Sequence, residues 1–558
     1  MAVRPRFDVP KRAQEASIQQ INLPAPDGGV DAKSPLPSMQ GMNSVYSYNL
    51  TVEEGAVKTR PGYRQWSLNL ETSSVTHVGT LIPFIGTTNK LFAVTNEGIW
   101  DVSSYNTTPT HDLSGWSDTS ANAGYGVWTS FTADNGDQYI FYADSVNGIY
   151  QYNVTTPTSP NKWVRPSWLL GGVDITSNVN FVVVHKQRIW FAQKDSQTAG
   201  YLGIGAVSGA ATAFYFGSKF KHGGDLVGLF NWTVDGGGGV DDYLVSVSEG
   251  GDLIPYRGED PSSADSWSQV GSYYIGKPPK GGTFASEYAG ELYFLSAFGI
   301  LAMSDILKGV DLGDSNRNPR SLSFKIARLL RDDISSRGNL YGWQMTFVPS
   351  RGDLIVNTPT GGVTYALQYV LNLAMGAWSF WREVPMEAVT EWNDNLYMAG
   401  YLTNTVNVYA MDVNRDNQLI TAPASGLNGD AIDFSILSSF SPLNSPAQYK
   451  MAQYVRTDFL TDQASTPHQT KVLYDYDVKE LSRVNASPED TTLTTSVWDT
   501  SNWDQALWGG GQYLPYTTSV TGSSDIGRTI AIALRGTADG KTTLLGWDLA
   551  WKTARYSL

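Results

Sequence analysis

One pattern recurs seven times between Lys90 and Asp412: an apolar strand, a tight turn usually built on glycine, and a second strand rich in aromatic or β-branched residues. The first four intervals between successive turns are 48 to 52 residues long. A period of about fifty residues is typical of β-propellers, in which each repeat forms one blade. The copies begin at Lys90, Gln138, Arg188, Tyr243, Glu291, Asp353 and Asn395, and their turns lie near Gly98, Gly148, Gly200, Gly251, Gly299, Gly362 and Thr403.

We expect six or seven blades, because a single blade cannot bury both faces of its sheet and must stack against neighbours. The interval from Gly299 to Gly362 is longer than the others, and the next one is shorter. The long interval contains a segment with helical spacing of apolar residues behind Pro319, which predicts a helix over 321–336 that protrudes from the propeller as an insertion. The apolar positions are Leu322, Ile326, Leu329, Leu330 and Ile334.

The composition favours an all-β chain. The 558 residues include 55 glycines, 30 tyrosines and 18 tryptophans, and only 16% are charged, which suits many short strands joined by tight turns. The absence of cysteine excludes disulfides and thiolate metal sites. No apolar stretch is long enough to cross a membrane, and the first twenty residues lack the apolar region of a signal peptide, so we expect neither a membrane-spanning segment nor classical secretion.

Three regions are expected. Residues 1–70 are predicted to form an extended N-terminal arm and platform lead-in, because prolines at positions 5, 10, 24, 26, 35 and 37 exclude long helices there. The first twelve residues are basic, and the arm is either a disordered terminus or a strap laid on a neighbouring subunit. Residues 75–412 are predicted to form the propeller. Residues 413–558, where the repeat stops and strand-like runs continue, are predicted to form a separate β-rich platform domain.

Five tryptophans in the last region fit either of two roles. Aromatic side chains dominate subunit interfaces, and they also fill domain cores. The sequence leaves both alternatives open for Trp498, Trp503, Trp508, Trp547 and Trp551.

No motif for catalysis is recognisable, so we predict no enzyme, no catalytic residues, no cofactor and no metal site. The histidines at 77, 111, 185, 222 and 468 lack metal-ligand spacing, and His185 is expected to form a structural hydrogen bond. The segment from Asp412 places oxygen ligands at positions 1, 3 and 5 of a calcium-type loop, but it lacks glycine at position 6 and has Pro423 at position 12. We interpret it as a polar turn between domains.

The net charge of −14 argues against general binding to the phosphate backbone of nucleic acids, which requires basic surface. It is compatible with a passage for DNA, because an acidic or neutral lining does not hold phosphates. The charge also serves solubility in any soluble protein.

Several ordered segments resemble one family of virion proteins. The segment 43–66, NSVYSYNLTVEEGAVKTRPGYRQW, looks like the opening of proteins from short-tailed bacteriophages in which a glycine turn leads into Arg-x-Gly-Tyr, here Arg60 to Tyr63. Upstream, INLPAPDGGVDAKSPLPSM resembles their Leu-Pro-Ala-Pro-x-Gly-Gly stretch. Further similar segments are YRGEDPSSADSWSQVGSYYIGKPP, FGILAMS, VVVHKQRIWF, NLAMGAWSFW and SVWDTSNWDQALWG.

The family comprises tail nozzle or hub subunits, also called tail tubular protein B. The resemblance implies a structural virion protein of the phage tail, assembled in the host cytoplasm as a homohexamer below the adaptor ring of the head-to-tail connector. It also implies a conduit for DNA ejection, with a peripheral propeller on each subunit and possible contacts to tail fibres or tip proteins. The competing hypothesis is a propeller that binds or cleaves carbohydrate in recognising a host receptor. A generic scaffold of the WD type is disfavoured by the lack of repeated Trp-Asp strand ends.

Overall fold

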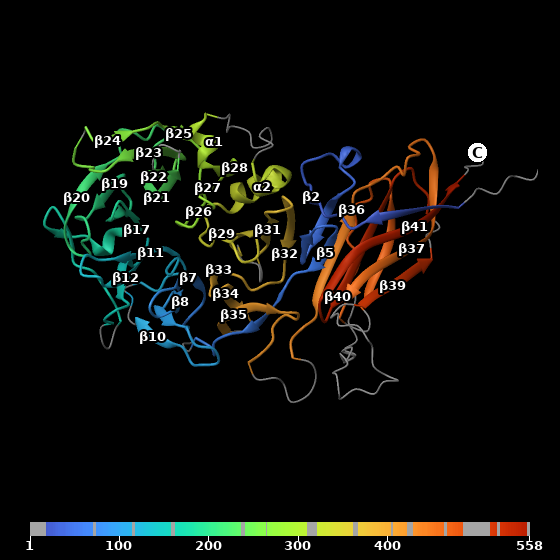
Figure 1. Cartoon of the computed structure of the whole chain (residues 1–558), viewed down its shortest axis with the longest axis horizontal. Helices are drawn as coiled ribbons and strands as arrows, with labels where there is room; N and C mark the ends of the chain where they lie inside the picture. The colour runs from blue at the N-terminus through green and yellow to red at the C-terminus, as the bar shows by residue number, and fades with distance from the viewer. Residues whose placement is uncertain are drawn as a thin grey trace, which may run out of the picture.

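The fold is a β-propeller with a β-sandwich beside it (Figure 1). In this computed structural model the described residues are 18–70, 74–113, 116, 118–157, 162–235, 240–263, 265–309, 321–360, 366–402, 405–420, 428–462, 466–483, 514–521 and 525–554. The expectation of an all-β chain with a propeller and an additional β-rich part is confirmed.

Seven sheets surround the propeller axis, so of the two expected blade numbers the larger one applies. Blade one has β7 (Val78–Phe84), β8 (Lys90–Thr95), β9 (Ile99–Asp101) and β10 (Thr110–Leu113). Blade two has β11 (Gly126–Thr132), β12 (Gln138–Asp144), β13 (Gly148–Asn153) and β14 (Trp163–Val164). Blade three has β17 (Val179–His185), β18 (Arg188–Gln193), β19 (Thr198–Tyr201) and β20 (Gly209–Tyr215), extended outward by β15 (Trp168–Leu170) and β16 (Val173–Asp174). The 3₁₀ turn η2 (Thr176–Asn178) leads into it.

The remaining blades vary more. Blade four has β21 (Leu226–Asp235), β22 (Val240–Ser248), β23 (Asp252–Gly258), β24 (Trp267–Gln269) and β25 (Tyr273–Tyr274). Blade five has only β26 (Ala285–Tyr288), β27 (Glu291–Ser296) and β28 (Gly299–Ala302). Blade six has β29 (Gln344–Val348), β30 (Asp353–Asn357), β31 (Gln368–Asn372) and β32 (Ala377–Trp381). Blade seven has β33 (Ala388–Trp392), β34 (Asn395–Leu402), β35 (Thr405–Val413) and, as its outer strand, β6 (Gly62–Gln65).

The sequence repeat corresponds to the second and third strands of each blade, counted from the axis. Gly98, Gly148, Gly251 and Gly299 have positive φ at the turns between these strands, a conformation that glycine adopts without strain. Gly200 differs, because it lies within β19 rather than at the preceding turn. The turn positions Gly362 and Thr403 lie outside the described residues.

In three blades, a polar side chain next to this turn forms hydrogen bonds with the loop that leads into the blade. Asn96 bonds the backbone of the entry loop of blade one in both directions, accepting from Thr76 N and donating to Ser74 O. Asp144 accepts from Gly124 N in blade two, and Asp252 accepts from His222 N in blade four. Since these groups are buried, their hydrogen bonds also remove the cost of unpaired polar atoms.

The predicted helix is present. The 3₁₀ turn η3 (Phe324–Ile326) continues into α2 (Ala327–Arg337), between blades five and six, after the short α1 (Met303–Leu307). Ile326, Leu330 and Ile334 are buried in the same apolar cluster as the strands of blade five. The helix therefore packs against the blade rather than protruding from it as the repeat spacing suggested.

The N-terminal strand β6 closes the propeller ring. It pairs antiparallel with β35, and β33 of the same blade packs beside β7 of blade one. Tyr63 of β6 is 3% exposed and meets the ring of Tyr409 edge-on at 5.3 Å between centroids. The first and last parts of the propeller are thus held together by side chains far apart in sequence.

The second part is a two-layer sandwich built from both ends of the described chain. One sheet contains β1 (Gln19–Pro24), β4 (Leu50–Glu53), β5 (Ala56–Thr59), β37 (Tyr449–Thr461), β39 (Leu514–Thr521) and β41 (Thr542–Ala554). The other contains β2 (Gly29–Val30), β3 (Asn43–Tyr48), β36 (Ile432–Ser438), β38 (His468–Tyr474) and β40 (Ile530–Ala538). The 3₁₀ turn η1 (Leu36–Ser38) lies between β2 and β3.

This arrangement differs from the expected extended arm. Residues 19–59 form strands that pair with the C-terminal strands of the same chain: β1 lies along β41, and β3 lies beside β36. Ala25, Leu50 and Val57 are buried in the sandwich core. The proline-rich lead-in lacks enough apolar residues for a core of its own, and the C-terminal strands supply the rest. Residues 1–17 lie outside the described residues.

Two of the five tryptophans belong to this core. Trp547 is 0% and Trp551 2% exposed within the single chain, so the core alternative applies to both and they are not interface anchors. Trp498, Trp503 and Trp508 lie outside the described residues.

Propeller and sandwich are joined through a shared sheet. Strand β32 of blade six pairs in parallel with β3 of the sandwich, so one sheet extends through both parts. Asn49 N, directly after β3, donates to Phe380 O of β32 at 2.7 Å. The buried Asn49 side chain accepts from Arg60 Nε at 3.0 Å and from Arg382 N at 2.8 Å, and donates to Asp433 O at 2.8 Å. Because this amide bonds groups from both parts, the two parts are held in one orientation.

Candidate functional site: the cavities along the propeller axis

The innermost strands position the cavities of the propeller. Each of β7, β11, β17, β21, β26, β29 and β33 is the terminal strand of its sheet, so one row of its backbone N–H and C=O groups points away from the sheet. Residues just before or at the start of these strands line a cavity on one face of the propeller, and residues in their middles line a second cavity along the axis. We call the first the face cavity and the second the channel cavity.

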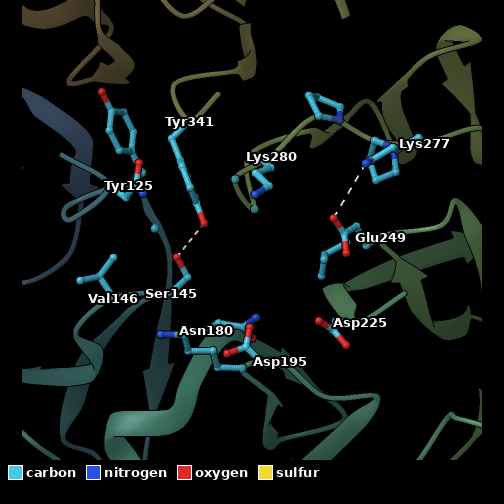
Figure 2. Close-up of a pocket in the computed structure, with 18 residues that line it drawn as sticks. Tyr125, Ser145, Val146, Asn180, Asp195, Asp225, Glu249, Lys277, Lys280 and Tyr341 are labelled. Carbon is cyan, nitrogen blue, oxygen red and sulfur yellow. Dashed lines mark hydrogen bonds and ion pairs between the residues drawn. The ribbon is translucent and has the colours of Figure 1, made fainter. Parts of the chain in front are cut away.

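The face cavity has a volume of about 290 Å³ and a mixed polar and charged lining. Figure 2 shows Tyr125 and Tyr341 on one side and the pair of Lys277 and Glu249 on the other. The two tyrosine rings stack at 5.9 Å between centroids, and Tyr341 Oη lies 3.0 Å from Ser145 Oγ. The rings give this side a flat aromatic surface.

Three carboxylates and three lysines line the face cavity, so its charged side chains balance in number. They are Asp195, Asp225, Glu249, Lys194, Lys277 and Lys280. Burial raises the pKa of Asp225, and the charges of Glu249 and Asp195 raise it further. Lys277 Nζ lies 3.9 Å from Glu249 Oε1, a distance at which the ion pair is weak.

A third, much smaller cavity shares lining residues with both of the others. Its volume is about 10 Å³, and its lining includes Gly79, Tyr125, Gly282, Gln344 and Glu387. We call it the neck. A space of this size holds about one water molecule at most.

Glu387 is the most perturbed carboxyl at the neck. Burial raises its pKa to about 7, although its Oε2 accepts a hydrogen bond from Val78 N at 3.1 Å. The bond links the entry of blade seven to blade one. The charge of Glu387 in turn contributes to the raised pKa of the Tyr125 hydroxyl, after burial.

The channel cavity has a volume of about 470 Å³ and touches the innermost strands of all seven blades. Its lining contains hydroxyl, amide and apolar side chains and one carboxyl, Glu287. Trp128 of β11 lines it and is 36% exposed, although it lies on an inner strand. Neither Trp128 nor Tyr341 was singled out in the sequence. The available signal was their position at the start of an inner strand of a repeat.

The histidines occupy separate positions with ordinary partners. His185 Nδ1 lies 2.6 Å from Asn231 Oδ1, and burial lowers the pKa of its ring. His222 contacts Asp252 Oδ1 at 2.7 Å, and His77 contacts Ala123 O at 2.8 Å. His111 stacks on Trp100, and His468 contacts Thr466 O.

The calcium-type loop is used for ion pairs. Asp412 pairs with Arg64 through two hydrogen bonds, and Asp416 pairs likewise with Arg60. Residues 421–427 of the loop lie outside the described residues. Within the described part of the chain, no group of three or more His, Cys, Asp or Glu residues is arranged to hold a metal ion.

Among the helices that the structure describes, none is both long and apolar enough to span a membrane.

No protein-family model matches the chain, and neither does any curated protein. Among solved structures, the chain is similar to BBS1N in its complex with ARL6DN, with 12% identity and a TM-score of 0.35 over 63% of this chain and 98% of that one. It is also similar to the extracellular domain of the putative hybrid two-component system BT3049 from B. thetaiotaomicron, with 10% identity and a TM-score of 0.39 over 88% and 61%. A third is the quinonprotein alcohol dehydrogenase-like protein BT1487 from Bacteroides thetaiotaomicron, with 12% identity and a TM-score of 0.32 over 57% and 67%.

Proposed function

We propose that the chain is a structural, non-enzymatic subunit of the tail nozzle of a short-tailed bacteriophage, and that six copies form a ring through which DNA is ejected. The proposal starts from the ordered segments that resemble this family. One of them, residues 43–66, covers β3 to β6, the stretch that runs through the sandwich and then closes the propeller.

The observation that carries the proposal is the small size of the space along the propeller axis. The channel cavity touches the innermost strands of all seven blades and has a volume of about 470 Å³, which is too small to hold a DNA duplex. A conduit built from this chain has to lie between subunits. The propeller then stands at the periphery, and the sandwich lines the ring.

The sandwich has a free side that suits such a ring. In the described residues, β39 is the end strand of one sheet and β38 the end strand of the other, while β4 on the opposite side packs against β31 and β32 of the propeller. Sheet edges present unpaired backbone groups that readily pair with another chain. We assign the side formed by β38 and β39, called here the free side, to the contact with the neighbouring copy.

The proposed partners follow from this assembly. The ring would dock below an adaptor ring of the head-to-tail connector and carry fibres or tip proteins, within a virion assembled in the host cytoplasm. DNA would pass without firm binding, because 53 acidic side chains outnumber 39 basic ones.

The test is native mass spectrometry of the full-length protein combined with duplex DNA titration. We expect six copies per particle and an affinity for duplex weaker than the roughly 10⁻⁴ to 10⁻⁶ M of non-specific DNA-binding proteins at physiological salt. A monomer, micromolar DNA binding with a steep salt dependence, or release of sugars from host polysaccharide would contradict the proposal.

A further inference from the structure

The channel cavity has the size and lining of a ligand site. Its volume of about 470 Å³ lies within the roughly 300 to 1,000 Å³ typical of small-molecule pockets. The cavity belongs to no site that the nozzle proposal uses, since DNA passes between subunits in that account.

The charges of the lining restrict the class of ligand. No lysine, arginine or histidine lines the channel cavity, and Glu287 is its single carboxyl. Phosphates and carboxylates would have no cation to pair with there. Burial raises the pKa of Glu287, which favours the neutral form of this group compared with an exposed glutamate. The lining therefore suits an uncharged ligand.

The polar groups of the lining can form hydrogen bonds with several hydroxyls of one ligand. Thr129, Ser286, Thr346 and Thr390 line the cavity, and none of these four hydroxyls bonds another side chain or the backbone within the described residues. The innermost strands add their outward rows of backbone donors and acceptors from seven directions. Asn231 contributes an amide, whose oxygen is shared with His185.

An aromatic surface completes the site. Trp128 lines the same cavity and keeps 36% of its surface exposed, whereas Val127 on the same strand and Phe181 on the next blade are buried in the core. A large exposed aromatic among hydroxyls offers an apolar face and nearby hydrogen bonds. A pyranose ring can stack its C–H face on the tryptophan and can form hydrogen bonds through its hydroxyls.

We propose that the channel cavity binds a neutral saccharide unit, stacked on Trp128 and hydrogen-bonded by the hydroxyl and backbone groups of the innermost strands. On a virion, such a site would recognise an uncharged sugar of a host surface. Binding alone is proposed, because the cavity lining holds one carboxyl and glycoside hydrolysis ordinarily uses two.

The test is saturation-transfer NMR and tryptophan fluorescence titration of the full-length protein with D-glucose, D-galactose and N-acetyl-D-glucosamine, and with glucose 1-phosphate as the anionic probe. We expect millimolar or tighter binding of at least one neutral sugar and at least tenfold weaker binding of the phosphorylated one. Trp128→Ala should weaken sugar binding at least tenfold. Tyr215→Ala is the matched aromatic control, because Tyr215 is 70% exposed on an outer strand away from the cavity.

Two isosteric variants protect the test against misfolding. Thr346→Val and Thr390→Val remove one hydroxyl each with nearly unchanged shape and should each weaken binding several-fold at an unchanged melting temperature. The proposal is overturned if no neutral sugar binds, if glucose 1-phosphate binds as well as glucose, or if binding survives Trp128→Ala and both valine variants. Failure here leaves the particle mass unaffected, so it is distinguishable from failure of the nozzle proposal.

Discussion

Arg60 and Asp416 form a buried two-bond ion pair that joins residues 356 positions apart in the chain. Arg60 Nη1 lies 2.7 Å from Asp416 Oδ1, and Nη2 lies 2.6 Å from Oδ2. Arg60 follows the last sandwich strand of the N-terminal segment, and Asp416 follows the last propeller strand. The pair therefore fixes the crossing point of the two segments that connect sandwich and propeller.

Removing one member of this pair should be costly. Burial raises the pKa of Asp416 even though the Arg60 guanidinium lowers it, because removal from water destabilises the carboxylate more than the guanidinium stabilises it. Arg60→Met leaves a carboxylate unpaired and should lower the free energy of unfolding by about 3 to 5 kcal/mol. Urea denaturation measures this change, and Arg60→Met with Asp416→Leu together should cost less than the sum of the two single changes.

The matched control is Arg64 with Asp412, the same two residue types in an exposed pair nearby, with side-chain exposures of 33% and 28%. Arg64→Gln should cost about 1 kcal/mol or less. Equal losses for Arg60→Met and Arg64→Gln would show that the buried pair has no special role.

Closure of the propeller depends on a glycine. A Cβ on Gly62 of β6 would lie 2.1 Å from Arg415 O and 2.6 Å from Arg415 N, so the strand cannot stay in place with a side chain there. Gly62→Ala should lower the melting temperature by several degrees. Gly41→Ala is the control, because a Cβ on Gly41 meets nothing within 4 Å. Equal melting temperatures for the two variants in a thermal scan would refute closure by β6.

Glu387 should make stability depend on pH. Its folded-state pKa of about 7 lies above the value of about 4.3 for an unfolded glutamate, so its contribution is complete below pH 4.3 and is lost as the pH rises through 7. Glu387→Gln keeps a neutral side chain at every pH. We expect it to be more stable than the wild type by about 3 to 4 kcal/mol at pH 8 and similar to it at pH 4. A difference between the two proteins that stays constant across this range would contradict the account.

The free side of the sandwich should be sensitive to a lost N–H group. Thr537 N donates to Pro467 O at 2.9 Å, so alternation along β38 turns the N–H groups of Thr470 and Val472 away from β40. Thr470→Pro removes one of these outward donors and should reduce the hexamer fraction in native mass spectrometry. Thr470→Val loses the same hydroxyl contact to Thr457 but keeps the N–H and should assemble normally. Identical assembly of both variants would exclude this edge from the contact.

The sequence predicted the propeller because its repeat is local. The second and third strands of the blades recur at nearly fixed spacing, with turn glycines such as Gly98 and Gly299 between them. Helix α2 shows its own helical spacing of apolar residues. The closing strand β6 could not be assigned to blade seven, because its partner β35 lies more than three hundred residues away and nothing in its four residues marks that pairing.

The β-rich part outside the propeller was predicted from the sequence. The strand pairing that joins residues 19–59 to the C-terminal strands, and the cavities, could not be predicted for the same physical reason. Segment 19–59 has too few apolar residues for a core of its own. Its Leu50 and Val57 are buried because the C-terminal strands cover them, and those strands lie hundreds of residues away in the sequence. The cavities arise where seven separate inner strands converge, so Trp128, Glu387 and Tyr341 acquire their surroundings only from the closed ring.

The most direct test of the central claim is a cryo-electron microscopy reconstruction of the purified full-length protein. We expect a six-fold ring with an axial hole wide enough for a DNA duplex, with sandwiches around the hole, propellers at the periphery and the side formed by β38 and β39 at the subunit contact. A monomer, or a ring in which the propellers surround the axis and the sandwiches point outward, would contradict the account.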